Sequence, residues 1–531
     1  MMISQTPRSS ALCALVLTTL VGSTDAQAPY CVAQAEALVP ASAGALDGLG
    51  RAVAFDGSWA ALGASLARRV TMYSKVDVNW TEEVDLAPAA AGGGFGSALA
   101  LDGDFLAVGA PFDDVDGADA GAVTLFEFDG SNWLEGPTLR PTTPVVGRRF
   151  GTSLALDGDR LVVGAPGDTI KGVGGAAYLF ENQNGLWTEV EELTASTGSI
   201  GGFGAAVAVD GDELLVGSPE ASLVHPFFLD MGAWLERATL STGVIDDGLG
   251  FAVDLEGTTA LIGAPFDSTF GEKLGAAYLA ELDMGAWSLV DTFRATDGVP
   301  KDSFGVAVDL DGVQFVVSSS GAPIAGSSGT LLPSGHAYLY RDDSGSFVEQ
   351  ARLDPTVSES GMFFGRAIAA SDNAILIGSA GSSANGILSG AVNVFRSGAS
   401  QEEYGAGTPG TDGFVPRVSL VGCAAPNTGF DIVVNDGIGG GLGLLVWSDQ
   451  PAAFPILGGT LLVNVPILNQ LPHQLGGSIG VGGEGSFAFP ASVANEGVAG
   501  FKFYMQAGYL DAEGPSGFSF STGLEIEFPT Y

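Results

Sequence analysis

Cysteine and basic residues are scarce in this chain. Its 531 residues include three cysteines, three histidines and 20 lysines and arginines, against 61 aspartates and glutamates, for a formal net charge of −41. Such an acidic surface repels phosphate backbones and anionic membranes, which excludes nucleic-acid binding. Acidic excess keeps a protein soluble and also attracts cations or a basic partner, and composition leaves these two roles open.

Long apolar runs are missing after the N-terminus. The only such run near the start is Ala11–Val21, preceded by Arg8 and followed by small residues. This pattern predicts a secretory signal peptide over residues 1–26, with a mature chain that begins at Gln27. No later stretch approaches the roughly 18 apolar residues that span a bilayer. We therefore expect an exported protein without a membrane span.

Glycine is abundant where these other features are scarce. The chain has 80 glycines and 46% hydrophobic residues, but only 15% charged residues. This hydrophobic content excludes disorder, and the glycines suit an all-β protein rich in turns. The length exceeds one ordinary core, so at least two domains or a repeat array are expected.

One unit of sequence recurs through most of the chain. Phe-Gly or Leu-Gly opens each copy, ahead of a strand with alternating apolar residues. The pair is found at Leu49-Gly50, Phe95-Gly96, Phe150-Gly151, Phe203-Gly204, Leu249-Gly250, Phe304-Gly305 and Phe364-Gly365. Most copies continue with an Asp-Gly turn, a Gly-Ala-Pro type ending, a third strand such as GAAYLF and a fourth strand, which in five copies begins at or near a Trp. A period near 50 residues made of four strands is typical of a propeller blade, so seven openings predict seven blades.

The last copy lacks a fourth strand, and the mature N-terminus offers one. The segment Val32–Leu38 has the length and phase of the other fourth strands, with Leu38 at the position of Leu193. We expect it to pair with the seventh blade and to close the ring, because closure removes two exposed edges. The alternative is a short surface helix, since Ala, Gln, Glu and Leu favour helix.

These motifs resemble the FG-GAP repeat propeller of integrin α-subunit heads and of many secreted bacterial proteins. The resemblance covers about residues 31–398. It implies a seven-bladed β-propeller over residues 27–398 whose first strands line a central channel, and a role in adhesion or ligand binding. Calcium-binding members carry a long acidic loop between the first two strands. Here only tight turns such as Asp102-Gly103-Asp104 stand there, and so short a turn cannot wrap an ion.

The repeat ends before the C-terminus. Residues 399–412 are rich in Gly and Thr and are interpreted as a linker. Residues 413–531 contain about seven short apolar runs separated by Gly or Pro, which predicts a C-terminal β-sandwich. The fold class expected for the whole chain is therefore all-β.

The best metal candidate is an acidic loop in the second blade. Asp113, Asp114, Asp116 and Asp119 offer hard oxygen ligands suited to calcium. The same residues are also typical of a solvated acidic loop, because Phe112 and Val115 interrupt the alternation that a wrapped site needs. No other cofactor is indicated.

A basic patch lies before the third blade. Arg140, Arg148 and Arg149 stand in the loop that leads to Phe150. Loops that join strands two to three and four to one emerge on one face of a propeller, and they are the least repeated part of each copy. We expect this face to contact an extracellular protein or glycan partner; ordinary loop variability is the alternative.

Catalytic patterns are poor. His225, His336 and His473 are scattered and show no zinc spacing. The match of Gly476–Gly480 to Gly-x-Ser-x-Gly lacks the strand-to-helix turn of a nucleophile elbow. Trp133 and its equivalents in other copies are expected to pack between blades rather than to stack on sugars.

The function expected from the sequence is therefore a secreted, monomeric, non-enzymatic binding or adhesion protein. Two alternatives remain open: a carbohydrate hydrolase with its site in the channel, and a purely structural surface or matrix component.

Removal of the signal peptide also removes Cys13 and leaves Cys31 and Cys423. If Val32–Leu38 completes the last blade, Cys31 lies beside residues 396–398, where the chain leaves for the C-terminal domain. We expect a Cys31–Cys423 disulfide in an oxidising compartment, with two free thiols as the alternative. Mass spectrometry of the alkylated mature chain under non-reducing conditions checks this, and two alkylated cysteines would rule the bridge out.

Overall fold

The computed structural model describes residues within 32–527, with gaps; residues 1–31 and 528–531 are not described. The gaps are residues 77–78, 90–92, 169, 171, 197–200, 270, 313, 322, 326–330, 334, 343–345, 358–360, 372–373, 398–399, 405–407, 410–413, 423–428, 439–441, 449–450, 457–458, 464–468, 476–481, 493–501, 512–517 and 522. The predicted signal peptide, Cys31, Cys423 and the Gly476–Gly480 motif therefore lie outside the described residues. The chain divides into two compact units, Glu36–Phe395 and a second unit of Met1–Ala35 with Arg396–Tyr531.

The repeats form seven four-stranded antiparallel sheets within the described residues. Sheets 1 to 3 contain β2 (Leu49–Phe55), β3 (Trp59–Ala64), β4 (Arg69–Val76) and β5 (Asn79–Leu86); β6 (Ala98–Asp102), β7 (Phe105–Ala110), β8 (Ala122–Phe128) and β9 (Trp133–Leu139); and β10 (Ser153–Asp157), β11 (Arg160–Ala165), β12 (Ala176–Gln183) and β13 (Leu186–Leu193). Sheets 4 and 5 contain β14 (Ala206–Asp210), β15 (Glu213–Ser218), β16 (Leu223–Asp230) and β17 (Ala233–Glu236), then β18 (Ala252–Glu256), β19 (Thr259–Ala264), β20 (Ala276–Asp283) and β21 (Ala286–Phe293).

The last two sheets depart from simple chain order. Sheet 6 contains β22 (Phe304–Asp311), β23 (Gln314–Ser319), β26 (His336–Asp342) and β27 (Phe347–Leu353), with a separate hairpin of β24 (Pro323–Ala325) and β25 (Leu331–Pro333) between its second and third strands. Sheet 7 contains β28 (Phe364–Ser371), β29 (Ala374–Ser379), β30 (Val392–Ser397) and, as its fourth strand, β1 (Val32–Leu38). The N-terminal segment thus pairs with β30, as its length and phase predict.

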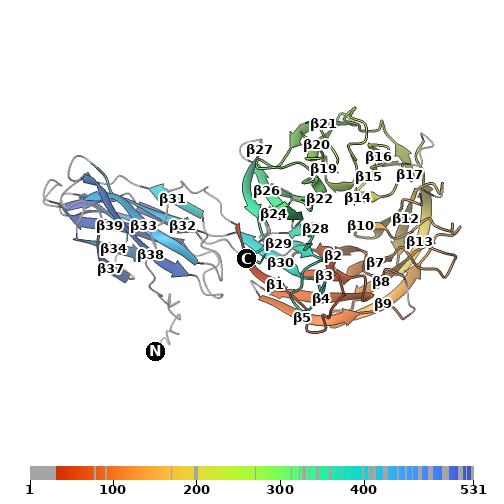
Figure 1. Ribbon diagram of the computed structural model, residues 1–531, viewed down its shortest axis with the longest axis horizontal. Helices are drawn as coiled ribbons and strands as arrows, with labels where there is room; N and C mark the ends of the chain where they lie inside the picture. The colour runs from red at the N-terminus through yellow and green to blue at the C-terminus, as the bar shows by residue number, and fades with distance from the viewer. Residues whose placement is uncertain are drawn as a thin grey trace, which may run out of the picture. The chain divides into compact units, whose positions relative to one another are not determined.

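The seven sheets surround a common centre, with the first strand of each nearest to it (Figure 1). We call these first strands the inner strands and the fourth strands the outer strands. Each inner strand contacts the inner strand of the next sheet, and β28 of sheet 7 contacts β2 of sheet 1. The first and last sheets are therefore neighbours in the same way as the sheets between them.

Glycine lets neighbouring sheets approach each other. A Cβ atom on Gly63, on the second strand of sheet 1, would lie less than 3.0 Å from the carbonyl oxygen of Gly96, the opening glycine of sheet 2. The same relation joins Gly378 of sheet 7 to Gly50 of sheet 1. The opening glycines also have positive φ, such as 83° at Gly50, a conformation that costs glycine little. Glycine at both positions is thus a packing requirement.

Apolar side chains fill the wedge between adjacent sheets. Trp133 of sheet 2 is buried against sheet 1, and its ring meets that of Trp59 edge-on at 5.4 Å. Equivalent clusters contain Trp187, Trp234 and Trp287, so the repeated tryptophans pack between sheets as predicted. Between sheets 7 and 1, Leu38 of β1 belongs to a cluster of the same kind.

One outer strand is shorter than its sequence suggests. The run from Trp234 to Leu240 predicts a full fourth strand, but β17 ends at Glu236. Pro226 on the neighbouring β16 has no N–H to donate, so the ladder is interrupted there. Pairing then resumes only as an isolated bridge between Val224 and Leu240.

The C-terminal unit is also built of strands. One sheet has the order β31 (Ser400–Tyr404), β41 (Gly523–Glu527), β39 (Lys502–Leu510), β34 (Leu442–Ser448) and β37 (Asn469–Gln474), and β40 (Phe518–Phe520) pairs with β39. A second has β32 (Arg417–Gly422), β33 (Gly429–Ile438) and β38 (Gly482–Ser492), and a hairpin joins β35 (Pro451–Ile456) to β36 (Gly459–Val463). The stretch interpreted as a linker thus contains β31, a polar strand that apolar patterning does not reveal.

No helix in the described part of the chain is long and apolar enough to cross a membrane.

A glycine-to-alanine substitution, which adds one methyl group, tests the contact between sheets 7 and 1. We expect Gly378→Ala to destabilise the protein by about 1–3 kcal/mol or more, because its Cβ would overlap the backbone of Gly50. Gly174→Ala is the matched control, since a Cβ atom there meets nothing within 4 Å. Thermal and denaturant unfolding measure both variants, and equal stability of the two would contradict the proposed close approach.

Candidate functional site

The loops at one end of the sheets are tied to one another by a repeated hydrogen bond. We define the loop face as the connections between second and third strands and between fourth and inner strands. The N–H that follows the Gly-Ala-Pro position donates to a carbonyl three residues before the opening glycine of the same sheet. The donor and acceptor pairs are Phe112 and Gly93, Gly167 and Arg148, Glu220 and Gly201, Phe266 and Asp247, Gly321 and Asp302, and Gly381 and Met362.

Backbone bonds also join the loops of adjacent sheets. Gly147 N–H donates to Ala118 O, and Lys301 N–H donates to Glu272 O. Leu46 N–H donates to Ile387 O, which links the loops of sheets 1 and 7 in the same manner. Backbone hydrogen bonds therefore tie the loops of the loop face to one another.

The acidic loop of sheet 2 is organised around an arginine. Arg140 Nη2 lies 2.9 Å from Asp113 Oδ1, and its Nε lies 3.0 Å from Asp116 Oδ2. Asp114 Oδ1 accepts a hydrogen bond from the N–H of Asp119 at 2.8 Å. Within the described residues, no three or more His, Cys, Asp or Glu side chains form a group that holds a metal ion. Calcium binding by this loop stays a prediction, and the geometry shows an ion pair in its place.

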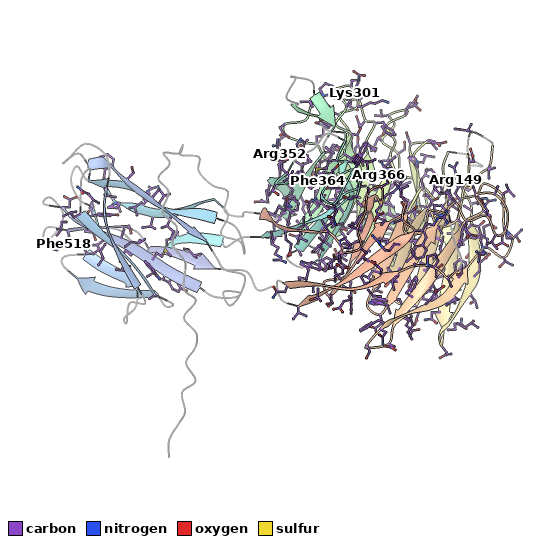
Figure 2. All side chains as sticks on the ribbon, turned by 60° about the horizontal axis from the view of Figure 1, so that its bottom comes forward. Arg149, Lys301, Arg352, Phe364, Arg366 and Phe518 are labelled. Atoms are coloured by element: carbon purple, nitrogen blue, oxygen red, sulfur yellow. The ribbon has the colours of Figure 1, made fainter. Side chains whose placement is uncertain are left out.

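The other arginines of the predicted basic patch are paired as well. Arg148 Nη1 lies 3.0 Å from Glu192 Oε1 and also donates to the Tyr178 hydroxyl. Arg149 Nη2 lies 3.2 Å from Asp168 Oδ2. Arg149, labelled in Figure 2, thus joins two loops of sheet 3, and Arg148 joins one of these loops to strands β12 and β13.

Large apolar side chains are exposed all around the loop face. They are Leu46, Leu66, Phe112, Val115, Val146, Ile170, Ile245, Phe251, Phe266, Val299, Val357, Phe363, Ile387 and Leu388. Ile170, Ile245 and Ile387 have relative exposures of 98%, 86% and 72%. Other large apolar side chains, such as Val76, Met231 and Met284, are exposed on outer strands and on the opposite hairpins. On the loop face, however, they lie on loops of adjoining sheets, an arrangement typical of an interaction surface.

Two arginines stand where the inner strands begin. Arg51 on β2 and Arg366 on β28 each follow an opening glycine, and the two strands are in contact. Both residues keep contact with solvent although strands surround them, and neither forms a hydrogen bond or an ion pair within the described part of the chain. Burial by the surrounding strands, and then the charge of Arg51, lower the pKa of Arg366.

Carboxylates lie further along two inner strands. Asp254 Oδ2 of sheet 5 accepts a hydrogen bond from Leu310 N–H of sheet 6, at 2.6 Å. Asp309 Oδ1 of sheet 6 accepts one from Ala370 N–H of sheet 7, at 3.0 Å. Burial raises the pKa of Asp254 to about 6, against the opposing effect of its backbone hydrogen bonds. Burial and the charge of Asp254 raise the pKa of Asp309.

The turn end of the inner strands carries acids that link the sheets. Asp102 Oδ2 accepts a hydrogen bond from Gly158 N–H at 2.6 Å, and Asp157 Oδ2 accepts one from Gly211 N–H at 2.7 Å. Asp210 and Glu256 repeat the contact to the next turn. The Asp-Gly pairs are hairpin turns, as predicted, and each also bonds to the following sheet. The opposite ends of the inner strands thus differ in charge.

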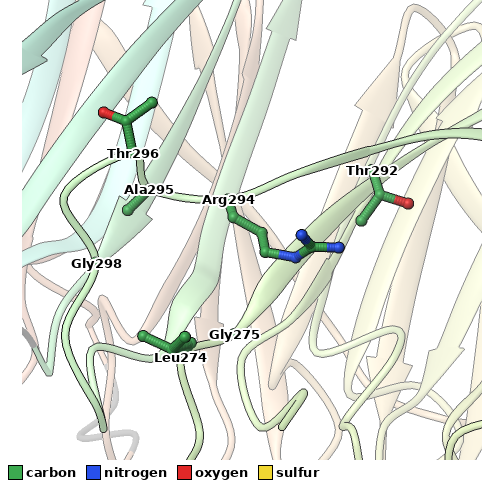
Figure 3. Close-up of a pocket in the computed structure, with 7 residues that line it drawn as sticks. All are labelled: Leu274, Gly275, Thr292, Arg294, Ala295, Thr296 and Gly298. Atoms are coloured by element: carbon green, nitrogen blue, oxygen red, sulfur yellow. The ribbon is translucent and has the colours of Figure 1, made fainter. Parts of the chain in front are cut away.

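A pocket of about 390 Å³ lies on the loop face between sheets 5 and 6. Leu274, Gly275, Thr292, Arg294, Ala295, Thr296 and Gly298 line it, and the Arg294 side chain extends across it (Figure 3). Nearby, Tyr278 donates its hydroxyl proton to Asp267 Oδ2 at 2.6 Å. Burial opposes ionisation of Asp267, but hydrogen bonds from Tyr278 and Thr269 outweigh it and lower the Asp267 pKa.

The described histidines of the sheets have structural partners. His225 is fully buried, and its Nδ1 lies 2.7 Å from Glu236 Oε1. His336 Nδ1 lies 2.5 Å from Asp354 Oδ1. Neither histidine stands beside a nucleophile at hydrogen-bond distance.

Sequence reasoning missed Arg51 and Arg366. Both follow the opening glycine, where the other copies have Ser97, Thr152, Ala205, Phe251 and Val306. The sequence did contain a signal for them, because arginine follows the opening glycine in the first and last copies and in no other copy. The two residues are 315 positions apart in the chain (366 − 51), so their proximity depends on the contact between sheets 7 and 1.

Comparison with known proteins identifies the repeat. Four segments match the family model described as FG-GAP repeat, at residues 80–126, 133–180, 234–280 and 347–395. Each segment runs from the outer strand of one sheet into the third strand of the next. No curated protein matches the chain.

Among solved structures, the chain is similar to a functionally unknown protein from Desulfotomaculum acetoxidans, with 10% identity and a TM-score of 0.40 over 56% of this chain and 84% of that one. It is also similar to a Bacteroides uniformis protein described as a "putative 6-phosphogluconolactonase", with 12% identity and a TM-score of 0.42 over 63% of this chain and 92% of that one.

The raised pKa of Asp254 predicts that replacing this carboxyl group with the neutral amide of Asn stabilises the fold, by an amount that depends on pH. The folded carboxyl titrates near 6 against an ordinary 3.8, so the charged form destabilises the fold above pH 6, and this cost fades as the pH falls toward 4. We expect Asp254→Asn to raise the melting temperature by about 1–3 °C at pH 7.5 and to change it little at pH 4.5.

Asp104→Asn, at an exposed turn, is the control and should change neither value. Calorimetry at the two pH values measures the difference. An equal effect of Asp254→Asn at both would show that Asp254 titrates normally.

Proposed function

We propose, from the four FG-GAP repeats that the chain contains, that it is a secreted binding or adhesion protein that contacts a protein or glycan partner through the loop face, without catalysis. We further propose that its seven sheets are the blades of a β-propeller closed by the N-terminal strand, and that the C-terminal unit is a β-sandwich. The contact between β28 and β2 and the pairing of β1 with β30 support closure.

The observation that carries this proposal is the set of exposed apolar side chains on a loop face held by its own backbone bonds. Ordering of loops on binding costs free energy, and loops that are already fixed avoid much of that cost. Apolar side chains at their tips supply surface that gains from removal from water. A surface with these two properties suits a partner that lies across several loops.

Export supports the same function. The predicted signal peptide over residues 1–26 would deliver the chain outside the cell, where FG-GAP repeats are typical. The net charge of −41 keeps such a protein soluble and favours partners with basic groups around an apolar centre.

A carbohydrate hydrolase is the second candidate, and the Asp254–Asp309 pair is the observation that favours it. Glycoside hydrolysis uses two nearby carboxyl groups, one of them an acid with a raised pKa, and here the pKa values of both Asp254 and Asp309 are raised. Both carboxylates, however, accept hydrogen bonds from the backbone of the next sheet, which fits a structural role better.

Binding by the loop face can be tested with matched surface substitutions. The mature chain is screened on arrays of glycans and of extracellular proteins, with and without calcium. We expect the double variant Ile245→Asp and Ile387→Asp to weaken binding to the partner found by about tenfold or more, since central apolar contacts dominate interface energies.

Met231→Asp and Met284→Asp form the control, because these residues are 101% and 98% exposed on the opposite hairpins. The control should bind within about twofold of the wild type. Glycan turnover that Asp254→Asn abolishes would favour the hydrolase, and silence on every array would favour a structural component.

A further inference from the structure

Arg51 and Arg366 are two arginines on adjacent strands of the described sheets that form no ion pair; Arg68 and Arg160 also lack one, but Arg160 donates to Gly211 O and lies over the Trp234 ring. Arg69, Arg140, Arg148, Arg149, Arg237 and Arg352 each form an ion pair with a carboxylate. Arg51 and Arg366 have no such pair, although acidic residues outnumber basic ones threefold in the chain, at 61 against 20. Their surroundings therefore leave two positive charges uncompensated.

The two charges also oppose each other. The strands that carry them, β2 and β28, are in contact. Burial by the surrounding strands, and then the charge of Arg51, lower the pKa of Arg366. Two like charges held together at the ends of neighbouring strands are unfavourable for the unliganded fold. A group with two negative charges would remove this cost.

In the neighbouring sheets, the residue directly after the opening glycine is polar on one side of the two arginines and apolar on the other. Next to Arg51 around the ring of sheets come Ser97 and Thr152, whose hydroxyls donate to backbone carbonyls at 2.6 Å and 2.7 Å. On the other side of Arg366 come Val306 and the exposed Phe251. The position is thus polar beyond Arg51 and apolar beyond Arg366, and no carboxylate stands in it.

We propose that Arg51 and Arg366 together bind a dianionic oxyanion group, a sulfate or phosphate monoester, at the loop-face end of the inner strands. Guanidinium groups suit such oxyanions because their N–H donors form paired hydrogen bonds to two oxygens. The two positive charges of the arginines equal the two negative charges of a dianion, whereas a monocarboxylate would neutralise only one of them. The site lies at the loop-face end of the inner strands, so this inference rests on the proposed binding function and names a ligand chemistry for it.

Acidic residues at the opposite ends of the inner strands support an anion site at the loop-face end. Asp102, Asp157, Asp210 and Glu256 stand at the turn end, away from the arginines. An anion approaching that end meets repulsion, whereas the loop-face end attracts it. The charge arrangement therefore directs an anionic group toward Arg51 and Arg366.

Inorganic ions test the site without a knowledge of the partner. The mature protein is titrated with sulfate, phosphate or acetate at constant ionic strength set by chloride, so that general screening does not change. Calorimetry and thermal unfolding are the readouts. We expect sulfate or phosphate to bind and to raise the melting temperature, with acetate about tenfold weaker or more; the stronger of the two dianions identifies the source.

Three variants separate this site from a structural role. Arg366→Gln and Arg51→Gln should each weaken dianion binding about tenfold or more, yet leave the ion-free protein as stable as the wild type or more stable, because like-charge repulsion is relieved. Arg366→Lys keeps the charge and should retain part of the binding. Arg68→Gln removes the same charge from an exposed loop of sheet 1 and should change binding less than about twofold.

The proposal is overturned if Arg366→Gln binds sulfate and phosphate as the wild type does, or if the dianions do not bind at all. It is also overturned if Arg366→Gln destabilises the ion-free protein, which would give the arginine a structural role. The ion titrations use no partner, so their result does not depend on the outcome of the array experiment. In turn, a loss of dianion binding does not affect the contacts of the loop tips with a partner.

Discussion

The close approach of backbone between neighbouring sheets is the contact on which the rest of the structure depends. A glycine on the second strand of one sheet faces the carbonyl oxygen of the opening glycine of the next, at a separation that leaves no room for a methyl group. The relation is repeated around the sheets and joins Gly378 of sheet 7 to Gly50 of sheet 1. Only between sheets 6 and 7 does Ser318 replace the first glycine.

This approach explains why the residues around the glycines are also constrained. The sheets are wedged together at the inner strands, so large side chains are accommodated toward the outer strands, where Trp133 and its equivalents fill the wider gap. At the turn end, the inner strands come close enough for Asp102 to accept a hydrogen bond from the next turn. At the loop end, the same spacing brings the connections into backbone contact.

The functional surfaces follow from these constraints. Because backbone bonds hold the loops, their apolar tips need not be tucked inward to stabilise the fold, and they remain in solvent. Because inner strands are neighbours, a charge placed after one opening glycine acts on the next, and this applies to Arg51 and Arg366. Burial, and then the charge of Asp254 on sheet 5, raise the pKa of Asp309 on the neighbouring sheet 6 through the same proximity.

Local chemistry made much of the fold predictable. Asp-Gly turns, alternating apolar runs and a repeated Trp indicated the four strands of each copy and the role of the tryptophans, because hairpins and two-sided strands are encoded over a few residues. The phase of Val32–Leu38 indicated its pairing with β30. Prediction was weaker where a strand is polar, as in β31, or where a proline in the partner interrupts the ladder, as at Pro226.

The candidate sites were less predictable, because they depend on residues far apart in sequence. The acidic run from Asp113 to Asp119 is visible in the sequence, but only the fold shows that Arg140 lies against two of its carboxylates. Arg51 and Arg366 are ordinary residues in sequence and become neighbours through contact of the first and last sheets. The sequence by itself determined the repeat, its strands and its charge, since these are local or additive properties. The tertiary structure alone decided which charges meet, since electrostatic interaction depends on distance in space and not on separation along the chain.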